Sequence, residues 1–165
     1  MKIGILSDTH NQASNTCRAL DLLRERGAEQ LIHCGDITTP EIVGLFEGWP
    51  VVFVFGNMDH HAAALARAVE KLDGAVIGYQ FTAEIEGRRI AVCHGHDAQL
   101  LKEMTRAGLY DYVFHGHTHR RRHERVGETS IINPGALGGL RRQSRSVCVV
   151  DLAAGRVDFI DLENL

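Results

Sequence analysis

The sequence predicts an α/β fold in which two mixed β-sheets pack face to face as a sandwich flanked by helices. Two patterns predict it. Over residues 1–75, short apolar runs alternate with segments of helical periodicity, which is typical of βαβ units and a parallel sheet. Beyond residue 80, short strand-like runs follow one another across turn-forming residues. With 165 residues, 44% of them hydrophobic and 24% charged, the chain is expected to form a single domain over residues 1–165.

The first half should form three strands and three helices in alternation. The predicted strands cover residues 2–7, 31–34 and 51–55, and the predicted helices cover residues 12–26, 40–47 and 62–72. Residues 51–55 read VVFVF without polar alternation, as expected of a strand that is covered on both faces. Thr39 and Pro40 have the pattern of an N-cap followed by proline at the first helical position, so they should open the second helix.

The second half should form a hairpin, one helix and a further series of strands. The hairpin is predicted over residues 81–86 and 89–93, the helix over 98–107, and the strands over 112–114, 121–126, 129–133, 146–152 and 156–162. The stretches GE, NPGALGG and AAG separate the last four strands, and such turn sequences favour antiparallel pairing.

The charge balance and the cysteine pattern narrow the functional classes. The net charge is −3, so the sequence makes no strong electrostatic case for nucleic-acid binding. The apolar runs fall far short of the roughly 20 residues that a membrane span needs, and the start MKIGILSDTH reaches polar residues too early for a signal peptide. The four cysteines show no CxxC spacing. They are expected to be free thiols in a cytoplasmic protein.

Short clusters of polar residues directly follow several predicted strands, and these clusters contain the candidate metal-binding residues. Ten histidines are many for this length, and several of them stand in these clusters. Because the carboxyl ends of parallel strands open onto one crevice, the clusters are expected to converge. Extended residues two positions apart point to the same side, so paired residues within a cluster can act together. The candidate metal ligands are Asp8, His10, Asp36, Asn57, His94, His117 and His119.

This set of side chains predicts a site for two metals. Carboxylate, amide and imidazole groups suit divalent Mn, Ni, Fe or Zn, and the absence of thiolates in the clusters argues against a structural zinc site. Seven candidates exceed the needs of one tetrahedral ion. They suit two ions with one bridging carboxylate, which is the arrangement that clamps a phosphoester during hydrolysis.

The same motifs resemble those of the calcineurin-like metallophosphoesterases, in particular their small phosphodiesterase branch. The matching motifs, in order along the chain, are Asp8-x-His10, Gly35-Asp36, Gly56-Asn57, His94-Gly95-His96 and Gly116-His117-Thr118-His119. The resemblance runs from Met1 to at least the turn at residues 133–136. It implies a four-layer fold with a β-sandwich between helices, in agreement with the pattern above.

The resemblance also implies roles for the ligands. Asp8, His10 and His119 would bind a first metal, and Asn57, His94 and His117 a second, with Asp36 bridging both. Manganese is the favoured ion.

One position departs from the family pattern. Many members have histidine directly after the motif asparagine, where it protonates the leaving group, whereas this chain has Met58. His96 and His60 flank motif positions, and His96 is the favoured replacement for the proton donor. Asp59 is expected to accept hydrogen bonds beside the site rather than bind metal.

The predicted function is hydrolysis of a small-molecule phosphodiester, with a hydroxide that bridges the two metals as the nucleophile. Two alternatives stay open: a phosphomonoesterase, and a non-catalytic scaffold of the same fold, like the retromer subunit of eukaryotes. The sequence also leaves open whether the chain forms a homo-oligomer. Two basic stretches, residues 120–122 and 141–145, could contact phosphate or form a solvated surface.

Overall fold

A computed structural model describes residues 1–106, 108–139 and 145–162. The helices in these ranges are α1 (Ala13–Glu25), α2 (Pro40–Gly44), α3 (Ala62–Val69) and α4 (Ala98–Met104). The strands are β1 (Lys2–Leu6), β2 (Gln30–His33), β3 (Val51–Val54), β4 (Ala75–Gly78), β5 (Gln80–Ile85), β6 (Arg88–Cys93), β7 (Tyr112–Phe114), β8 (Arg122–Val126), β9 (Thr129–Asn133), β10 (Ser146–Asp151) and β11 (Arg156–Asp161).

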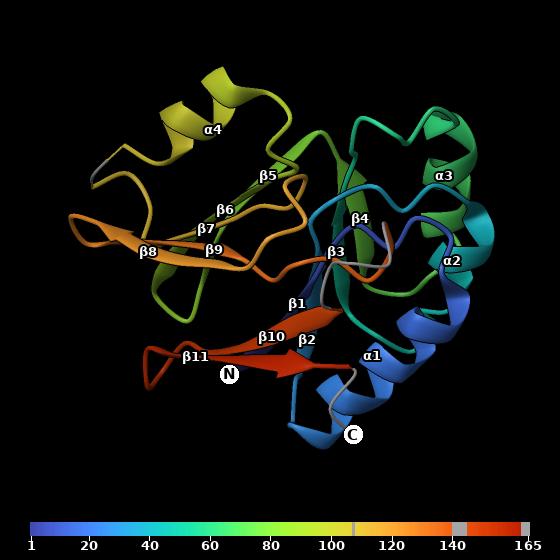
Figure 1. Cartoon of the computed structure of the whole chain (residues 1–165), viewed down its shortest axis with the longest axis horizontal. Helices are drawn as coiled ribbons and strands as arrows, with labels where there is room; N and C mark the ends of the chain where they lie inside the picture. Colours follow the sequence, from blue (N-terminus) through green and yellow to red (C-terminus); the bar gives the residue numbers. More distant parts are fainter. Residues whose placement is uncertain (107, 140–144, 163–165) are drawn as a thin grey trace.

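The strands form two mixed sheets, as predicted (Figure 1). The first sheet has the order β11-β10-β1-β2-β3-β4, with β1 to β4 parallel and β10 antiparallel to β1. The second has the order β5-β6-β7-β9-β8, in which β6, β7 and β9 run parallel and an antiparallel strand closes each edge. The carboxyl ends of the central strands of each sheet are therefore free to carry loops.

Two apolar layers hold the sandwich together. Between the sheets, side chains such as Ile5, Val54 and Phe114 are fully buried against one another. On the other face of the first sheet, residues such as Phe53 share an apolar cluster with residues of helices α1 to α3, among them Leu23 of α1. Helix α4 covers part of the outer face of the second sheet, and Figure 1 shows it on the opposite side of the molecule from the other helices.

Three details of the predicted elements were wrong. Strand β4 was not predicted, since its four residues are only partly buried and follow α3 closely. The last four strands form two antiparallel hairpins, which confirms the predicted pairing across the GE and AAG turns, but β9 does not pair with β10: the hairpins belong to different sheets, and β9 pairs with β7 in parallel. Thr39 stands at the N-cap of α2 without capping it, because its hydroxyl donates to Asn11 Oδ1 instead. Residue 107 of the predicted fourth helix lies outside the described residues.

In the described part of the chain, no helix is long and apolar enough to cross a bilayer.

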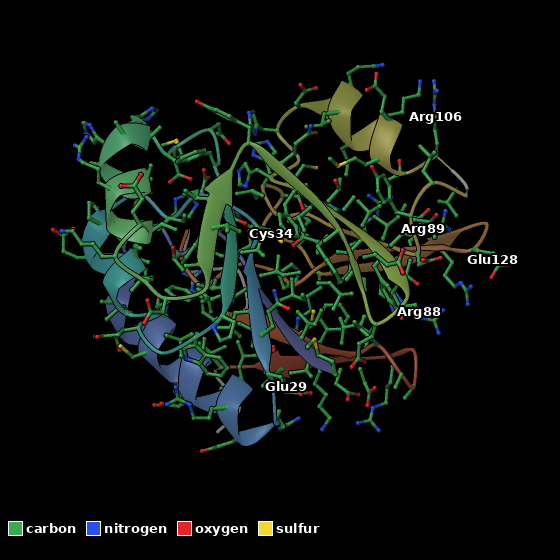
Figure 2. All side chains as sticks on the ribbon, turned by 180° about the vertical axis from the view of Figure 1, so that it is seen from behind. Glu29, Cys34, Arg88, Arg89, Arg106 and Glu128 are labelled. Atoms are coloured by element: carbon green, nitrogen blue, oxygen red, sulfur yellow. The ribbon has the colours of Figure 1, made fainter. Side chains whose placement is uncertain are left out.

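All four cysteines are free, and three of them are buried. Cys34 lies deep in the molecule (Figure 2). Burial raises the pKa of the Cys34 and Cys148 thiols and raises that of Cys93 to about 12. The reactive thiolate is therefore suppressed at these positions, while Cys17 is exposed.

We predict that one thiol per folded chain reacts rapidly with an aromatic disulfide reagent at pH 8, and that all four react after denaturation. The absorbance of the released thiolate measures both numbers. Cys17→Ser should abolish the rapid phase. A second thiol that reacts at the rate of Cys17 in the folded protein would contradict this assignment.

Candidate metal centre

Loops from both sheets meet at the carboxyl ends of β1, β2, β3, β6 and β7. Backbone hydrogen bonds join them in pairs: the Asp8 N–H donates to Gly35 O at 2.9 Å, and the Gly116 N–H donates to His94 O at 2.9 Å. The parallel register of β1, β2 and β3 places their ends side by side. The polar clusters therefore converge, as their positions in the sequence predicted.

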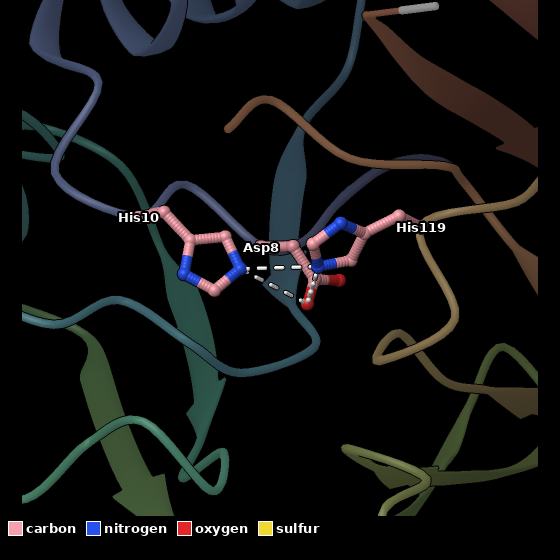
Figure 3. Close-up of side chains that lie close together, drawn as sticks. All are labelled: Asp8, His10 and His119. Carbon is pink, nitrogen blue, oxygen red and sulfur yellow. Dashed lines mark hydrogen bonds and ion pairs between the residues drawn. The ribbon is translucent and has the colours of Figure 1, made fainter. Parts of the chain in front are cut away.

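One group of candidate ligands consists of Asp8, His10 and His119, whose ligand atoms lie within 4.8 Å of one another (Figure 3). Asp8 Oδ1 is 3.2 Å from His119 Nε2 and 3.8 Å from His10 Nε2, and the two ring nitrogens are 3.1 Å apart. Asp8 Oδ1 is buried and has no hydrogen-bond partner among the described residues. Burial of a carboxylate oxygen without a partner costs free energy. A cation bound at Asp8 Oδ1 would offset that cost.

A second group consists of Asp8, Asp36 and His94. Asp36 Oδ2 lies 3.4 Å from His94 Nε2 and 3.6 Å from His10 Nε2, so this carboxylate reaches toward both groups. The Nδ1 atom of His94 lies 2.7 Å from Cys34 O, and because a carbonyl only accepts, Nδ1 is the donor. In the neutral ring, Nε2 then carries the lone pair and faces Asp36 and Asn57 Oδ1, which is 3.1 Å away, whereas in the protonated ring Nε2 donates to Asp36.

The two groups fit divalent cations by the chemistry of their atoms. Acceptor atoms of carboxylate, amide and imidazole groups face one another, and this set suits Mn, Fe, Ni or Zn. His117 belongs to neither group, although its ring centroid lies 5.2 Å from that of His94. The site thus brings Asp8, His10, Asp36, Asn57, His94 and His119 together by their ligand atoms and places His117 at its rim.

Hydrogen bonds fix the two carboxylates. Asp8 Oδ2 accepts from the hydroxyl of Ser7 at 2.6 Å and from the backbone N–H of His117 at 3.1 Å. Asp36 Oδ1 accepts from the backbone N–H of Met58 at 2.8 Å. In each carboxylate the remaining oxygen is the one that faces the imidazoles.

Asp59 accepts hydrogen bonds beside the site, as predicted. It accepts from the N–H groups of Asp36 at 3.1 Å, Gly56 at 2.7 Å and Thr38 at 2.7 Å. Burial raises the pKa of Asp59 despite these bonds. Its role is to clamp the loop after β2 to the loop after β3.

The pKa shifts follow the same contacts. Burial opposes ionisation of Asp36, but its hydrogen bond with His94 and the N–H of Met58 outweigh burial and lower its pKa. Burial likewise opposes protonation of His94, yet the hydrogen bond with Asp36 and the charges of Asp8 and Asp36 raise its pKa. The negative potential that favours a proton on His94 would equally attract a divalent cation.

The ligand loops adopt an unusual backbone. Asp8, His10, Asp36, His117 and His119 all have positive φ angles, between 42° and 67°, a region that side chains other than glycine rarely occupy.

Two neighbouring glycines allow the loops to come so close. A Cβ atom on Gly56 would lie 2.1 Å from Asp36 Oδ1, and one on Gly116 would lie 1.9 Å from Ser7 Oγ. Both distances are far below van der Waals contact, so only glycine fits at these two positions.

Three polar residues beside the site were not predicted: Ser7, His33 and Asn133. His33 is fully buried, accepts from the Gly35 N–H at 3.2 Å through Nδ1, and lies 3.3 Å from Thr9 Oγ1 through Nε2. Burial lowers its pKa to about 3, so it stays neutral. Ser7 adjoins Asp8 in the sequence, but nothing in the sequence signals the contacts of His33 or Asn133.

The residues expected to flank the site are exposed. His96 lies with its ring centroid 5.4 Å from that of His94 and 6.2 Å from that of His117. Met58 is 44% exposed, and His60 is exposed in the same loop. Of the two basic stretches, Arg121 pairs with Asp161 and Arg122 with Glu124, while residues 141–144 lie outside the described residues.

Comparison with known proteins agrees with this geometry. The model of the calcineurin-like phosphoesterase superfamily domain matches residues 1–155. The chain belongs to this superfamily. Phosphodiesterase MJ0936 of Methanocaldococcus jannaschii is 32% identical over 154 residues, which cover 92% of this chain and 93% of that protein. This relative is named as a phosphodiesterase, which supports a phosphoric ester hydrolase activity for the chain.

Solved structures share the fold. The structure of an archaeal phosphodiesterase superposes with a TM-score of 0.92 at 30% identity, covering 98% of this chain and all of that one. Vps29 from Entamoeba histolytica superposes with a TM-score of 0.69 at 18% identity, covering 98% and 99%. The second likeness shows the fold alone.

We predict that a divalent cation stabilises the folded chain. Binding at a free concentration 100 times the Kd adds about 2.7 kcal/mol to the free energy of unfolding, which corresponds to a rise in Tm of about 5–11 °C for a chain of this size. Differential scanning fluorimetry with and without manganese, after chelation, measures the shift.

Asp8→Asn should lose most of this shift because it removes the charge that faces His10 and His119. Asp111→Asn is the matched control, since Asp111 pairs with Arg89 and belongs to neither ligand group. An equal shift in Asp8→Asn and in the unsubstituted chain would rule out Asp8 as a ligand.

Proposed function

We propose that the chain is a phosphodiesterase that uses two divalent cations, preferably manganese. Asp8, His10 and His119 would hold one ion. Asn57, His94 and His117 would hold the other, with Asp36 between them. The observation that carries this proposal is the placement of Asp36 Oδ2 within 3.6 Å of His10 Nε2 and 3.4 Å of His94 Nε2, so that one carboxylate reaches both groups.

The charge of such a site favours an anionic substrate. When bound, two cations would polarise the phosphoryl oxygens and would lower the pKa of water enough to supply a hydroxide nucleophile at neutral pH. Asp8 and Asp36 offset part of that charge without cancelling it. The transition state carries more negative charge than a diester in its ground state, so the site stabilises it more strongly.

His96 is our candidate for the group that protonates the departing oxygen. It is exposed beside His94 and His117, where a substrate held at the cations would lie within its reach. Its neighbour in the sequence, Asp97, caps helix α4 by accepting from the N–H groups of Gln99 and Leu100, which fixes the loop that carries His96. Met58 is exposed too, but its side chain holds no titratable proton.

A relative named as a phosphodiesterase, at 32% identity over nearly its whole length, supports a diester rather than a monoester as the substrate. The second candidate function is that of a non-catalytic scaffold, because the chain shares its fold with Vps29. The full set of ligand residue types favours the enzyme. We place the protein in the cytoplasm because its four cysteines form no disulfide.

We predict that the purified protein hydrolyses an aryl phosphodiester faster than the matching monoester, and only with a divalent metal. Manganese or nickel should restore activity after chelation better than magnesium, because imidazole nitrogen binds transition-metal ions more readily than it binds Mg²⁺, which prefers oxygen ligands. Release of the aryl alcohol, measured with each metal, gives the ranking. Full activity in magnesium alone after stringent metal removal would contradict the proposal.

Asp36→Asn should lower kcat by orders of magnitude and reduce the metal content to below two ions per chain, because it removes the shared charge. Elemental analysis of metal-replete protein gives the stoichiometry, with Asp111→Asn as the control. Less than one ion per unsubstituted chain, without hydrolysis, would favour the scaffold.

We predict that His96→Ala slows diesters with poor leaving groups by about 10²–10⁴-fold while it slows nitrophenyl diesters much less, because general acid catalysis matters most for a basic leaving oxygen. A series of diesters with graded leaving-group pKa values measures this dependence. Met58→His should flatten the dependence and raise monoester turnover.

His60→Ala is the matched control, since it removes an exposed histidine from the neighbouring loop. If His96→Ala lowers all rates equally, His96 binds phosphate and is not the acid. If the rate of the unsubstituted chain does not depend on leaving-group pKa, and stays independent of it in both alanine variants, neither histidine is the donor.

A further inference from the structure

Asn133 connects the end of β9 to the loop that carries His117 and His119. It is the last residue of β9 and is fully buried. Strand β9 pairs in parallel with β7, and the His115 N–H donates to Ile132 O at 3.0 Å, so Asn133 lies beside the loop that follows β7.

The two halves of the Asn133 carboxamide serve different segments. Oδ1 accepts from the Gly135 N–H at 2.9 Å and so closes the turn at residues 133–135. Nδ2 donates to Gly116 O at 2.7 Å and to Thr118 Oγ1 at 3.1 Å. These are the two shortest contacts of Nδ2, which also lies 3.4 Å from His115 Nδ1. Gly116 and Thr118 are the residues on either side of His117.

The loop needs such support because its own backbone does not favour this shape. His117 and His119 have φ angles of 67° and 57°, and left-handed backbone at residues other than glycine persists only where the surroundings impose it. From the side of the first sheet, Asp8 Oδ2 accepts from the His117 N–H at 3.1 Å. From the side of the second sheet, Asn133 holds the residues before and after it.

We propose that Asn133 is a positioning residue for the metal centre, whose two Nδ2–H bonds hold Gly116 and Thr118 so that His119 faces Asp8 and His117 faces His94. The inference rests on the proposed metal site. Groups that orient ligands in this way typically change metal affinity by 10–100-fold when they are lost. A residue that only closed the 133–135 turn would leave metal affinity unchanged.

The chain offers variants that separate the two roles. Asn133→Asp keeps an oxygen that can accept from Gly135 but loses both donors. Thr118→Val removes one acceptor of the pair at an exposed position, so the core stays intact. Ser146→Ala is the matched control, because the Ser146 hydroxyl donates to Pro134 O at 2.7 Å and supports the same turn, while in the described part of the chain it makes no hydrogen bond to residues 115–119.

The experiment is a titration of the metal-free protein with cobalt(II), followed by its visible absorption bands, which report both affinity and the nitrogen ligands around the ion. Asn133→Asp should bind cobalt 10–100-fold more weakly, with altered bands. Thr118→Val should bind several-fold more weakly, and Ser146→Ala should bind as the unsubstituted chain does.

Cobalt affinity in Asn133→Asp within twofold of the unsubstituted chain would overturn the proposal, as would an equal loss in Ser146→Ala. If Asn133→Asp does not fold, Thr118→Val decides, and an unchanged affinity there overturns it. If the unsubstituted chain binds no cobalt, the proposed metal function fails as well. If that chain binds cobalt and all variants bind it equally, only the positioning role fails.

Discussion

The burial of two carboxylates at the ends of neighbouring strands is the constraint on which the site depends. Asp8 and Asp36 are nearly inaccessible to water, and Asp8 Oδ1 has no hydrogen-bond partner among the described residues. Removing such charges from water costs several kcal/mol each unless donors or cations compensate. The hydroxyl of Ser7 and the N–H groups of His117 and Met58 satisfy one oxygen of each carboxylate. The other oxygens are left for the imidazoles and for a cation.

The sandwich is what makes this compensation feasible. The candidate ligands come from both sheets, because the loops after β1 and β2 contribute the two carboxylates while the loops after β6 and β7 contribute most of the histidines. The fully buried side chains between the sheets align their carboxyl ends. Backbone bonds such as Gly116 N–H to His94 O then join neighbouring loops. Precision at the site is therefore a property of the packing of two sheets and of the hydrogen bonds that join their loops, such as that from the His117 N–H to Asp8.

Local patterns in the sequence predict the central strands and the polar clusters that follow them. Residues 51–55 could be predicted as a central strand because a strand that is buried on both faces needs apolar residues throughout. Strand β4 was not predicted because its apolar run, AVIG, is only four residues long and ends in a glycine. Sheet membership depends on distant pairing, such as that of Lys2 with Asp151, which no local signal encodes. For the same reason the convergence of the candidate ligands could be predicted from strand ends, whereas the contacts of His33 and Asn133 could not.

The left-handed backbone of five candidate ligand residues has a consequence for which substitutions the protein can accept. Each such position costs of order 1–3 kcal/mol, a sizeable share of the stability of a typical domain. Glycine would adopt the same backbone without that cost. At Asp8, His10, Asp36, His117 and His119, the amino acid that best suits the backbone is therefore glycine, which has no side chain with which to bind a cation. Selection for thermal stability alone would therefore replace these residues. Relatives that retain all five would be expected to have been selected for metal binding.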